Sequence, residues 1–364
     1  MSTDPPIPPV RSAGIVLPCD DLDATMTFFT DLGFELRAIA PPDDPTRATL
    51  VGFGLRLHLE PDLDIDPGIL RLSCDHAAVG GRDVRTAPNG TRVELVTDSA
   101  SVPIPTGHSR YGISRAADAT WTTGRAEMRY RDLVPDRAGD ALVASLIHIE
   151  AGGPVADYVH FHHVAFQLIY CASGWVEVVY EDQGAPFVLE QGDAVLQPPG
   201  IRHQVRESSD DLVVIEVTVP ADHDTMADPE TELPNEAFRP SRRFGGQRFT
   251  RHIAGRSIWV PWNANADFEG QRLRIDVPTN HLAGAWTVRA KHDGAESLVP
   301  GSPAVTLLTV LDGEADLDCA DEPPTRLQVA DAAVIPPQRS YRLQADDQFE
   351  MLVVTLNLPD GQSS

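Results

Sequence analysis

The strongest constraint on the fold is a pattern that the chain carries twice. The segment QGDAVLQPPGIRH at 191–203 aligns with VADAAVIPPQRSY at 329–341, and both contain Asp-Ala-x-x-x-Pro-Pro. Turn residues upstream of each segment also fall at matching places. The duplicated unit is roughly 110–120 residues long, which is too long for a solenoid repeat. The sequence therefore predicts two copies of one domain rather than an array of small repeats.

Both copies have the pattern of short β-strands. In the first, apolar runs such as ALVASLIHIE, FQLIYC and LVVIEVTVP are separated by turn residues. The 31 prolines and 27 glycines among 364 residues exceed the average share and favour many turns. Short strands with frequent turns are typical of closed all-β barrels or sandwiches. We therefore expect a mainly β protein, with β-barrels at 125–222 and 247–360 joined by a polar linker at 223–246.

A small α+β domain is expected at 12–98. An opening strand leads into the helical segment DLDATMTFFTDL, with Asp20 or Asp21 as N-cap and Gly33 where a helix C′ glycine belongs. Strand-like stretches at ATLVGFGLRLHLE, GILRLSCD and TRVELVTD then give the order β-α-β-β-β. Residues 1–11 are expected to form a flexible tail, and 99–124 a linker that packs on its neighbours.

Charge and composition exclude several classes of partner. Lys and Arg number 29 against 54 Asp and Glu, which gives a net charge of −25. Nucleic acids and anionic membranes both require a basic surface, so neither is expected as a partner. The longest apolar runs fall short of the roughly 18–20 residues of a membrane span. The four cysteines are scattered and the N-terminus lacks an apolar signal segment, so we expect a cytoplasmic protein.

Four histidines carry the strongest chemical signal. His160, His162 and His163 lie in YVHFHHVAFQ, and His203 follows a Pro-Pro-Gly turn. Side chains alternate along a strand, so His160 and His162 share a face that His163 does not. Two imidazoles at i and i+2 can bind one ion when a neighbouring strand supplies a third donor, a role that His203 could fill.

These histidines stand in patterns that resemble the two cupin motifs, and the chain as a whole resembles a bicupin. His160-x-His162-(x)4-Gln167-(x)6-Gly174 matches HxH(x)3–4E(x)6G with Gln in the place of Glu, and Gly192-(x)5-Pro198-x-Gly200-(x)2-His203 matches G(x)5PxG(x)2H. The resemblance implies two cupin barrels, which are double-stranded β-helices. It also implies four metal ligands: His160, His162, Gln167 and His203. Direct ligation by Gln167 and a hydrogen bond from Gln167 to bound water or substrate are both open.

The exchange of Glu for Gln has a consequence for charge. Three imidazoles and an amide are neutral, so they leave the charge of a divalent ion uncompensated. A carboxylate, enolate or catecholate substrate could supply that charge by binding the metal directly. We therefore expect one divalent ion per chain, with Fe(II) favoured and Mn, Ni, Cu or Zn as alternatives.

The second copy lacks the motif residues. Tyr341 stands at the place of His203, and Val299, Gly301 and Thr306 replace His160, His162 and Gln167. We therefore expect a degenerate second barrel.

Two arginines are candidates for binding the substrate in the first barrel. Arg129 and Arg131 share one strand face and could clamp a substrate carboxylate there, although solvated surface arginines are the alternative.

The N-terminal region resembles the glyoxalase/bleomycin-resistance (vicinal oxygen chelate) family. The resemblance rests on DLDATMTFFTDLGFEL and APNGTRVELV. Active members of that family carry a His or Glu in the first strand, where this chain has Gly14, while Glu94 stands at the ligand position of the final strand. One ligand does not hold a catalytic metal, so we expect a domain without a metal that shapes the structure or a ligand site.

Three functions remain open from sequence. The leading hypothesis is a non-haem dioxygenase acting on a small anionic chelator of the hydroxy-aromatic acid or diketone type, because gentisate-type bicupins also combine a three-histidine barrel with a metal-free one. The second is a redox-neutral isomerase, epimerase or lyase, and the third a small-molecule binding or sensor protein without catalysis. The family resemblance also suggests a homodimer.

Overall fold

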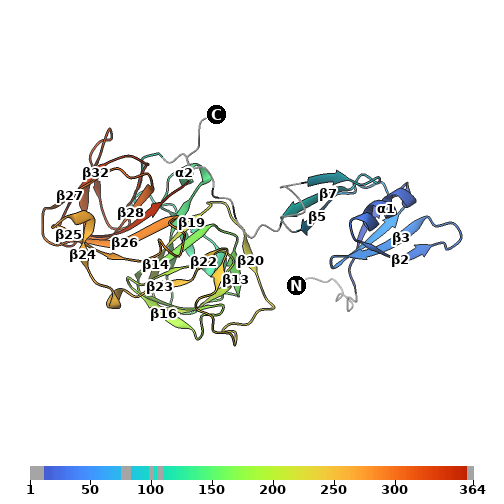
Figure 1. Cartoon of the computed structure of the whole chain (residues 1–364), viewed down its shortest axis with the longest axis horizontal. Helices are drawn as coiled ribbons and strands as arrows, with labels where there is room; N and C mark the ends of the chain where they lie inside the picture. Colours follow the sequence, from blue (N-terminus) through green and yellow to red (C-terminus); the bar gives the residue numbers. More distant parts are fainter. Residues whose placement is uncertain (1–11, 75–82, 98–101, 103, 105–109, 359–364) are drawn as a thin grey trace, which may run out of the picture. The chain divides into compact units, whose positions relative to one another are not determined.

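The chain divides into two compact units. The computed structural model describes residues 12–74, 83–97, 102, 104 and 110–358. One unit comprises residues 1–100 and the other residues 101–364 (Figure 1). Strands dominate both units, which confirms the predicted mainly β class.

The smaller unit begins with a four-stranded sheet and one helix. Its elements are β1 (Ile15–Pro18), α1 (Leu22–Asp31), β2 (Glu35–Ala40), β3 (Arg47–Gly52) and β4 (Leu55–Glu60), in the sheet order β1-β4-β3-β2. Asp21 caps α1 by accepting a hydrogen bond from the amide of Ala24, as its position predicts. Phe29, on α1, is fully buried against the sheet.

The strand count of this unit differs from the prediction. The stretch 48–60 forms a hairpin instead of one strand, because Phe53 and Gly54 both adopt positive φ angles and turn the chain. The order β-α-β-β-β is therefore already complete at residue 60. A separate three-stranded sheet follows, in the order β5 (Ile69–Cys74), β7 (Arg92–Thr97) and β6 (Asp83–Thr86).

Each half of the larger unit contains two sheets that face each other. In the first half, the larger sheet has the order β23 (Thr250–His252), β17 (Ala194–Leu196), β14 (Phe166–Ser173), β19 (Leu212–Val219), β11 (Val143–Ile149), β10 (Arg129–Asp132) and β9 (Thr122–Thr123). The smaller has the order β16 (Phe187–Glu190), β15 (Trp175–Tyr180), β18 (His203–Ser208), β13 (His160–His162) and β20 (Thr225–Ala227), with β12 (Gly153–Pro154) also paired to β18. We call this half barrel 1.

Barrel 2 repeats the arrangement. Its larger sheet has the order β24 (Val260–Pro261), β25 (Phe268–Arg272), β26 (Ala283–Ala290), β33 (Glu350–Leu356), β28 (Val305–Asp312), β31 (Ala332–Ile335) and β8 (Gly112–Ser114). Its smaller sheet has the order β27 (Ala295–Val299), β32 (Tyr341–Ala345), β29 (Ala315–Cys319) and β30 (Thr325–Leu327). Short connecting elements are η1 (Arg125–Glu127), α2 (Arg137–Asp140), β21 (Arg243–Phe244), β22 (Gln247–Arg248), η2 (Ala254–Arg256) and η3 (Trp262–Ala264).

The two barrels exchange edge strands. β8 precedes barrel 1 in the chain but pairs with β31 of barrel 2, and β23 pairs with β17 of barrel 1. The repeated aspartates fix both exchanges, because Asp331 accepts a hydrogen bond from the amide of Ala116 and Asp193 from that of Ala254. The stretch 99–124, expected to be a linker, therefore contains an edge strand of barrel 2, and the polar stretch 223–246 contains β20 of barrel 1.

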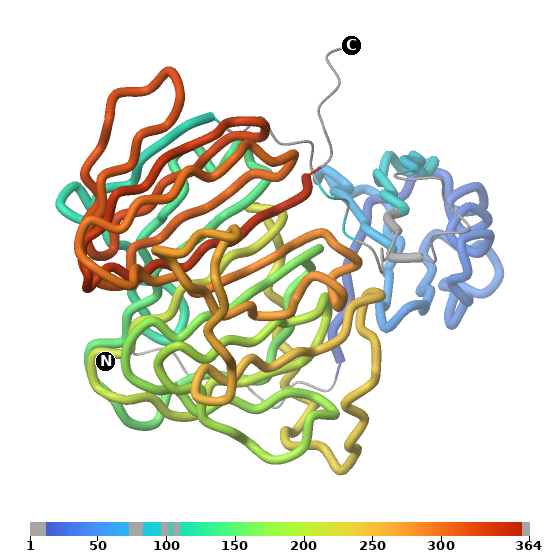
Figure 2. Tube along the Cα trace, turned by 60° about the vertical axis from the view of Figure 1, so that its left-hand side comes forward, coloured from blue at the N-terminus to red at the C-terminus, as the bar shows by residue number. Residues whose placement is uncertain are grey.

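The large sheets of the two barrels pack against each other (Figure 2). This shared core includes Leu168 and Val217 from barrel 1 and Leu307 and Val354 from barrel 2. Each barrel has a separate interior on the other face of its large sheet. Alternation along the strands of the large sheets therefore assigns one set of side chains to the shared core and the next to a barrel interior.

Candidate metal centre and its cavity

Three histidines meet inside barrel 1. His160 and His162 lie on β13, and His203 begins the adjacent strand β18, directly opposite His160. One ring nitrogen from each of the three lies within 4.8 Å of the others. All three side chains are buried. The alternation of β13 also excludes His163 from the residues that line the cavity.

The second ring nitrogen of each histidine orients the first. Nδ1 of His160 lies 2.8 Å from the carbonyl of Tyr158, and Nδ1 of His203 lies 3.0 Å from the carbonyl of Ile201. Nδ1 of His162 lies 2.9 Å from Thr225 Oγ1. A carbonyl can only accept, so Nδ1 of His160 and His203 carries the proton and Nε2 presents a lone pair. Within the described part of the chain, the buried Nε2 of His160 has no hydrogen-bond partner.

Burial keeps this cluster neutral. Loss of solvation lowers the pKa of His162 to about 2, and nearby His160 and His223 add to the effect. Burial likewise lowers the pKa of His160 and holds that of His203 well below its usual range. Neutral imidazoles are the form that binds a metal ion. The donor set therefore fits one divalent cation.

Gln167 lies in the same cavity within a chain of hydrogen bonds. Its amide oxygen accepts from Gln197 Nε2 at 2.8 Å, and its amide nitrogen donates to Glu216. The hydroxyl of Tyr180 in turn donates to Gln197 Oε1. Both ends of the Gln167 amide thus have protein partners, and its ligation of a metal stays a prediction.

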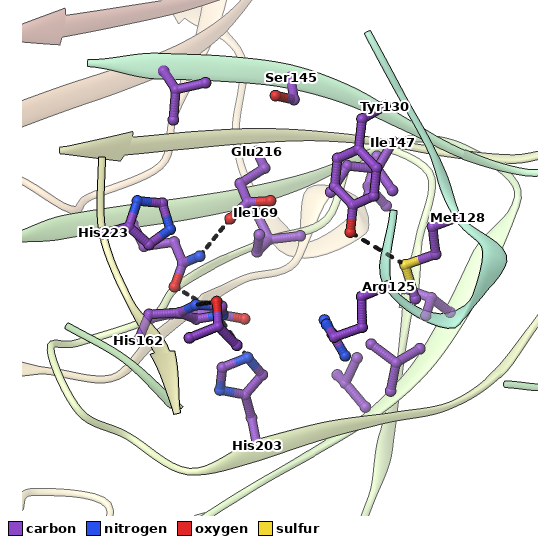
Figure 3. Close-up of a pocket in the computed structure, with 18 of the residues that line it drawn as sticks. Arg125, Met128, Tyr130, Ser145, Ile147, His162, Ile169, His203, Glu216 and His223 are labelled. Carbon is purple, nitrogen blue, oxygen red and sulfur yellow. Dashed lines mark hydrogen bonds between the residues drawn. The ribbon is translucent and has the colours of Figure 1, made fainter. Parts of the chain in front are cut away.

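His162 and His203 line a cavity of about 650 Å³ in barrel 1 (Figure 3). Most of its wall is apolar and includes Ile147, Ile169 and Val214. In Figure 3 Arg125 points into the cavity beside Met128, and Glu216 lies on another side of it. The size and the mix of apolar walls with few charged groups are typical of sites for small organic ligands.

Arg125 is, with Arg137, one of two arginines that line this cavity. It forms an ion pair with Asp157, whose side chain is fully buried, while Arg125 itself stays 24% exposed. Asp157 also accepts a hydrogen bond from the amide of Val205 and lies 3.6 Å from Nδ1 of His160. The arginine is therefore anchored at one side and accessible at the other.

Arg129 and Arg131, expected to clamp a substrate carboxylate, do not line the cavity of the metal centre. These two side chains do share a face, but it is the outer face of β10, because Tyr130 between them lines the cavity. Arg129 is exposed and stacks on Trp121 at 5.3 Å. Arg131 is buried against barrel 2 and donates to the carbonyl of Ala330.

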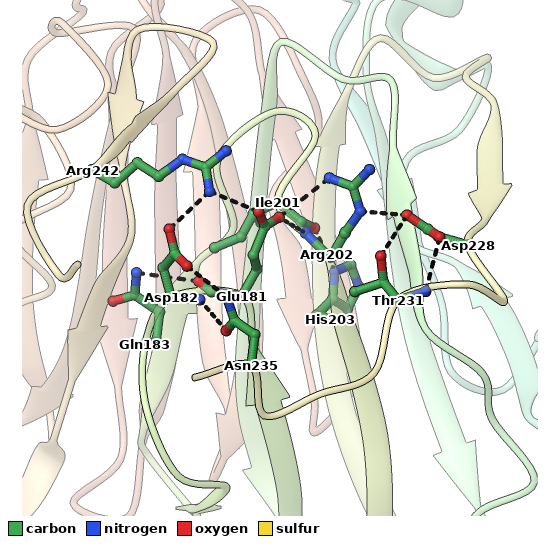
Figure 4. A network of polar contacts seen from close by, with 10 residues as sticks. All are labelled: Glu181, Asp182, Gln183, Ile201, Arg202, His203, Asp228, Thr231, Asn235 and Arg242. Atoms are coloured by element: carbon green, nitrogen blue, oxygen red, sulfur yellow. Dashed lines mark hydrogen bonds and ion pairs between the residues drawn. The ribbon is translucent and has the colours of Figure 1, made fainter. Parts of the chain in front are cut away.

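A polar network supports the turn that leads into His203 (Figure 4). Arg202 forms ion pairs with Asp228 and Glu181. Arg242 bridges Glu181 and Asp182, at 2.7 and 2.8 Å. These contacts tie the stretch 228–242 to the start of β18 and so restrict the position of the His203 backbone.

Barrel 2 has neither histidines nor charged side chains at the equivalent positions. Val299 pairs with Tyr341 across β27 and β32, as His160 pairs with His203. By the same registers, Gln197 corresponds to Ile335 and Glu216 to Val353. No group of three potential metal-binding His, Cys, Asp or Glu side chains occurs in barrel 2 as described.

Glu94 of the smaller unit has charged partners. This side chain is buried on β7 and forms ion pairs with Arg71 at 3.0 Å and Arg92 at 3.2 Å. The glyoxalase-like character of the unit stays a prediction.

Comparison with known proteins supports the cupin fold. Residues 145–219 match the family model of the cupin domain. No curated protein matches the chain. No helix among the described residues is long and apolar enough to span a membrane.

Solved structures resemble the two-barrel unit. Oxalate decarboxylase from Lactobacillus farciminis, in a formate complex, has a TM-score of 0.53 at 13% identity, over 72% of this chain and 89% of that one. The Bacillus subtilis oxalate decarboxylase gives 0.53 at 10%, over 71% and 78%. Salicylate 1,2-dioxygenase from Pseudoaminobacter salicylatoxidans, with gentisate, gives 0.50 at 16%, over 69% and 82%. At these identities the likeness shows the fold: two cupin-type barrels in one chain.

Proposed function

We propose that the protein is a metal-dependent cupin dioxygenase for a small organic acid that chelates through two oxygens. The observation that carries the proposal is the convergence of three neutral imidazoles in an otherwise apolar cavity of small-ligand size. The structural likeness to a salicylate dioxygenase supports the reaction class, and that to oxalate decarboxylases supports a small carboxylic acid as substrate.

The charges of the cavity fit an anionic substrate. His160, His162 and His203 would hold the ion, which would supply open coordination positions and the redox chemistry needed to activate O₂. The three donors are neutral, so a negative substrate would balance the metal charge. Arg125 would bind a substrate carboxylate that lies away from the metal.

The other polar residues have roles that do not require ligation. Glu216 is the carboxylate of the cavity that can accept a proton from a substrate hydroxyl. Gln167 and Thr218 both donate to Glu216 and fix its position. The apolar walls exclude water from the reacting groups.

Oxygen uptake tests this proposal. The protein is loaded anaerobically with Fe(II) and mixed with salicylate, gentisate and a β-diketone in separate oxygen-electrode assays. We expect uptake with at least one of these substrates and its loss in His160→Ala, with His163→Ala as the matched control. Uptake that persists in His160→Ala, or absence of uptake with all three substrates, would contradict the proposal.

One observation favours the redox-neutral alternative. Glu216 lies in the same cavity as the histidines and could move a proton to and from a substrate carbon without any oxidant. Anaerobic exchange of substrate hydrogen for solvent deuterium, lost in Glu216→Gln, would identify this chemistry. Binding of the same compounds without uptake or exchange would instead identify a binding protein.

A further inference from the structure

A second cavity lies between the two barrels, outside the candidate metal centre. It measures about 330 Å³, at the small end of the roughly 300–1,000 Å³ range of ligand sites. Its wall combines Leu146 and Ile215 of barrel 1 with Thr309 and Leu311 of barrel 2. Val329, also in the wall, is 50% exposed, so the cavity reaches the surface.

This cavity contains a buried positive charge. Arg131 lines it and is only 2% exposed. Its partners are neutral groups, the carbonyl of Ala330 at 2.8 Å and the hydroxyl of Ser114 at 3.4 Å. Asp331 is the carboxylate that acts on Arg131 through space, and it already forms an ion pair with Arg115 at 3.0 Å. Two guanidinium groups therefore share one carboxylate.

Two residues that line the cavity each have a buried polar atom without a partner. Nε of Arg131 and Oγ1 of Thr309 are both buried and form no hydrogen bond within the described part of the chain. A buried donor without a partner costs about 1–3 kcal/mol, and more when it is charged. Both atoms belong to residues that line this one cavity.

The repeat explains why a cavity exists here. Across the large sheet of barrel 1, one row of paired residues contains Arg131, Leu146, Ile215 and Tyr170. The corresponding row of barrel 2 contains Gln271, Thr287, Leu352 and Thr309. Each row faces the other barrel.

The two ends of this interface differ in volume and charge. At one end Tyr170 receives a hydrogen bond from Thr287 at 3.2 Å, and the side-chain nitrogen of Gln271 donates to two carbonyls. At the other end Thr309 replaces the tyrosine and Arg131 replaces the glutamine. That end therefore has one phenol ring less and one positive charge more.

We propose that the inter-barrel cavity binds a small monocarboxylate with an aromatic or branched apolar body. The carboxylate would pair with Arg131 and accept a hydrogen bond from Thr309. The apolar body would occupy the space that Tyr170 fills at the other end. This site is separate from the metal centre, so the proposal does not depend on the proposed reaction.

Fluorine NMR with 4-fluorobenzoate tests the site. The titrations use the full-length Arg125→Gln protein without metal, because that change removes the arginine that points into the metal-centre cavity of barrel 1. We expect saturable binding, and about tenfold weaker binding after Arg131→Gln, which installs the residue of the equivalent position. Thr309→Tyr should abolish binding by filling the cavity. Arg129→Gln, an exposed neighbour, should leave the affinity unchanged.

The neutral analogue 4-fluorobenzamide separates charge recognition from simple apolar binding. We expect it to bind weakly and to show no dependence on Arg131. This comparison also decides the outcome if Thr309→Tyr fails to fold. Absence of saturable 4-fluorobenzoate binding, or an affinity that Arg131→Gln leaves unchanged, would overturn the proposal.

Discussion

Barrels 1 and 2 share their strand order and pairing register but differ in what fills them. In barrel 1 the interior positions Gln197 and Glu216 line a cavity, and His160 is buried beside it. The equivalent positions in barrel 2, Val299, Ile335 and Val353, belong to or pack against an apolar core. The same β-framework thus accommodates different interior side chains, because backbone hydrogen bonds hold the sheets together in both barrels.

The difference teaches how a site and a core are exchanged within one fold. A cavity leaves packing contacts unmade, and the polar groups buried in its wall lose their hydration, which costs free energy. Barrel 2 has the contacts that barrel 1 lacks, and the two share a continuous core between their large sheets. We infer that barrel 2 stabilises the unit while barrel 1 carries the chemistry. Four predictions test this division.

The largest effect is expected on metal binding. His162→Ala removes one of three converging donors, so we expect its metal affinity to fall by at least about 100-fold. His163→Ala, the neighbour on the opposite face of the strand, should keep the affinity of the wild type. Competition with a chromogenic chelator measures both variants, and equal affinities in the two would contradict the comparison.

The next effect concerns packing. Leu308 in barrel 2 and Ile169 in barrel 1 occupy equivalent strand positions, but Leu308 is 1% exposed whereas Ile169 lines the cavity. We expect Leu308→Ala to lower the free energy of unfolding by about 2–5 kcal/mol. Ile169→Ala should cost less than about 2 kcal/mol, because its side chain is only partly packed. Urea denaturation of both variants checks this, and equal losses would show that the interiors are equally packed.

Substrate binding should depend on the arginine that points into barrel 1. We expect Arg125→Gln to raise the KM for the carboxylate substrate about 10- to 100-fold, since it removes a charge-assisted hydrogen bond. Steady-state oxygen uptake at several substrate concentrations measures this. Arg129→Gln, on the outer face of β10, is the control, and a similar rise in both variants would restore the clamp expected from sequence.

The smallest effect is a pH dependence of stability. The pKa of His162 is about 2 in the folded protein, against about 6.5 when unfolded. The contribution of neutral His162 to the free energy of unfolding is therefore complete above pH 6.5. It is lost as the pH falls from there towards 2, because the unfolded chain binds the extra proton. Within that range we expect this histidine to lower the free energy of unfolding by about 1.4 kcal/mol for each pH unit of acidification.

Urea denaturation of the metal-free protein at pH 7.0 and 5.5 measures this dependence. In His162→Ala the free energy of unfolding should fall less steeply on acidification, because unfolding takes up about one proton fewer. His163→Ala should retain the slope of the wild type. An unchanged slope in His162→Ala would mean that the histidine is already solvated and protonated in the folded state.

The sequence was sufficient to predict that the histidines converge and that the two barrels have equivalent positions. His160, His162 and His203 were predicted from strand alternation and motif spacing, and the structure brings them together. The equivalence of Val299 and Tyr341 with His160 and His203 was also predicted, and the strand registers confirm it. The first inference rested on strand alternation and the resemblance to the cupin motifs, and the second on the alignment of the two repeats.

What the sequence could not supply depends on long-range pairing. The face of β10 that points inward is set by the neighbouring strands, so the sequence did not show that Arg129 and Arg131 lie outside the metal-centre cavity. Arg125 lies in a short turn before that strand, where no period applies. The strand exchange joins Ala116 to Asp331, which are far apart in the chain. Glu216 left a detectable signal, as the single charge within LVVIEVTVP.

The central claim is that one barrel binds a metal ion and the other does not. Equilibrium dialysis of the full-length protein against Fe(II) under anaerobic conditions, and against Mn(II) and Zn(II), measures it most directly. We predict one tightly bound ion per chain, reduced to none in the His160→Ala and His203→Ala variants. No bound ion in the wild type, or an ion that both variants retain, would contradict the account.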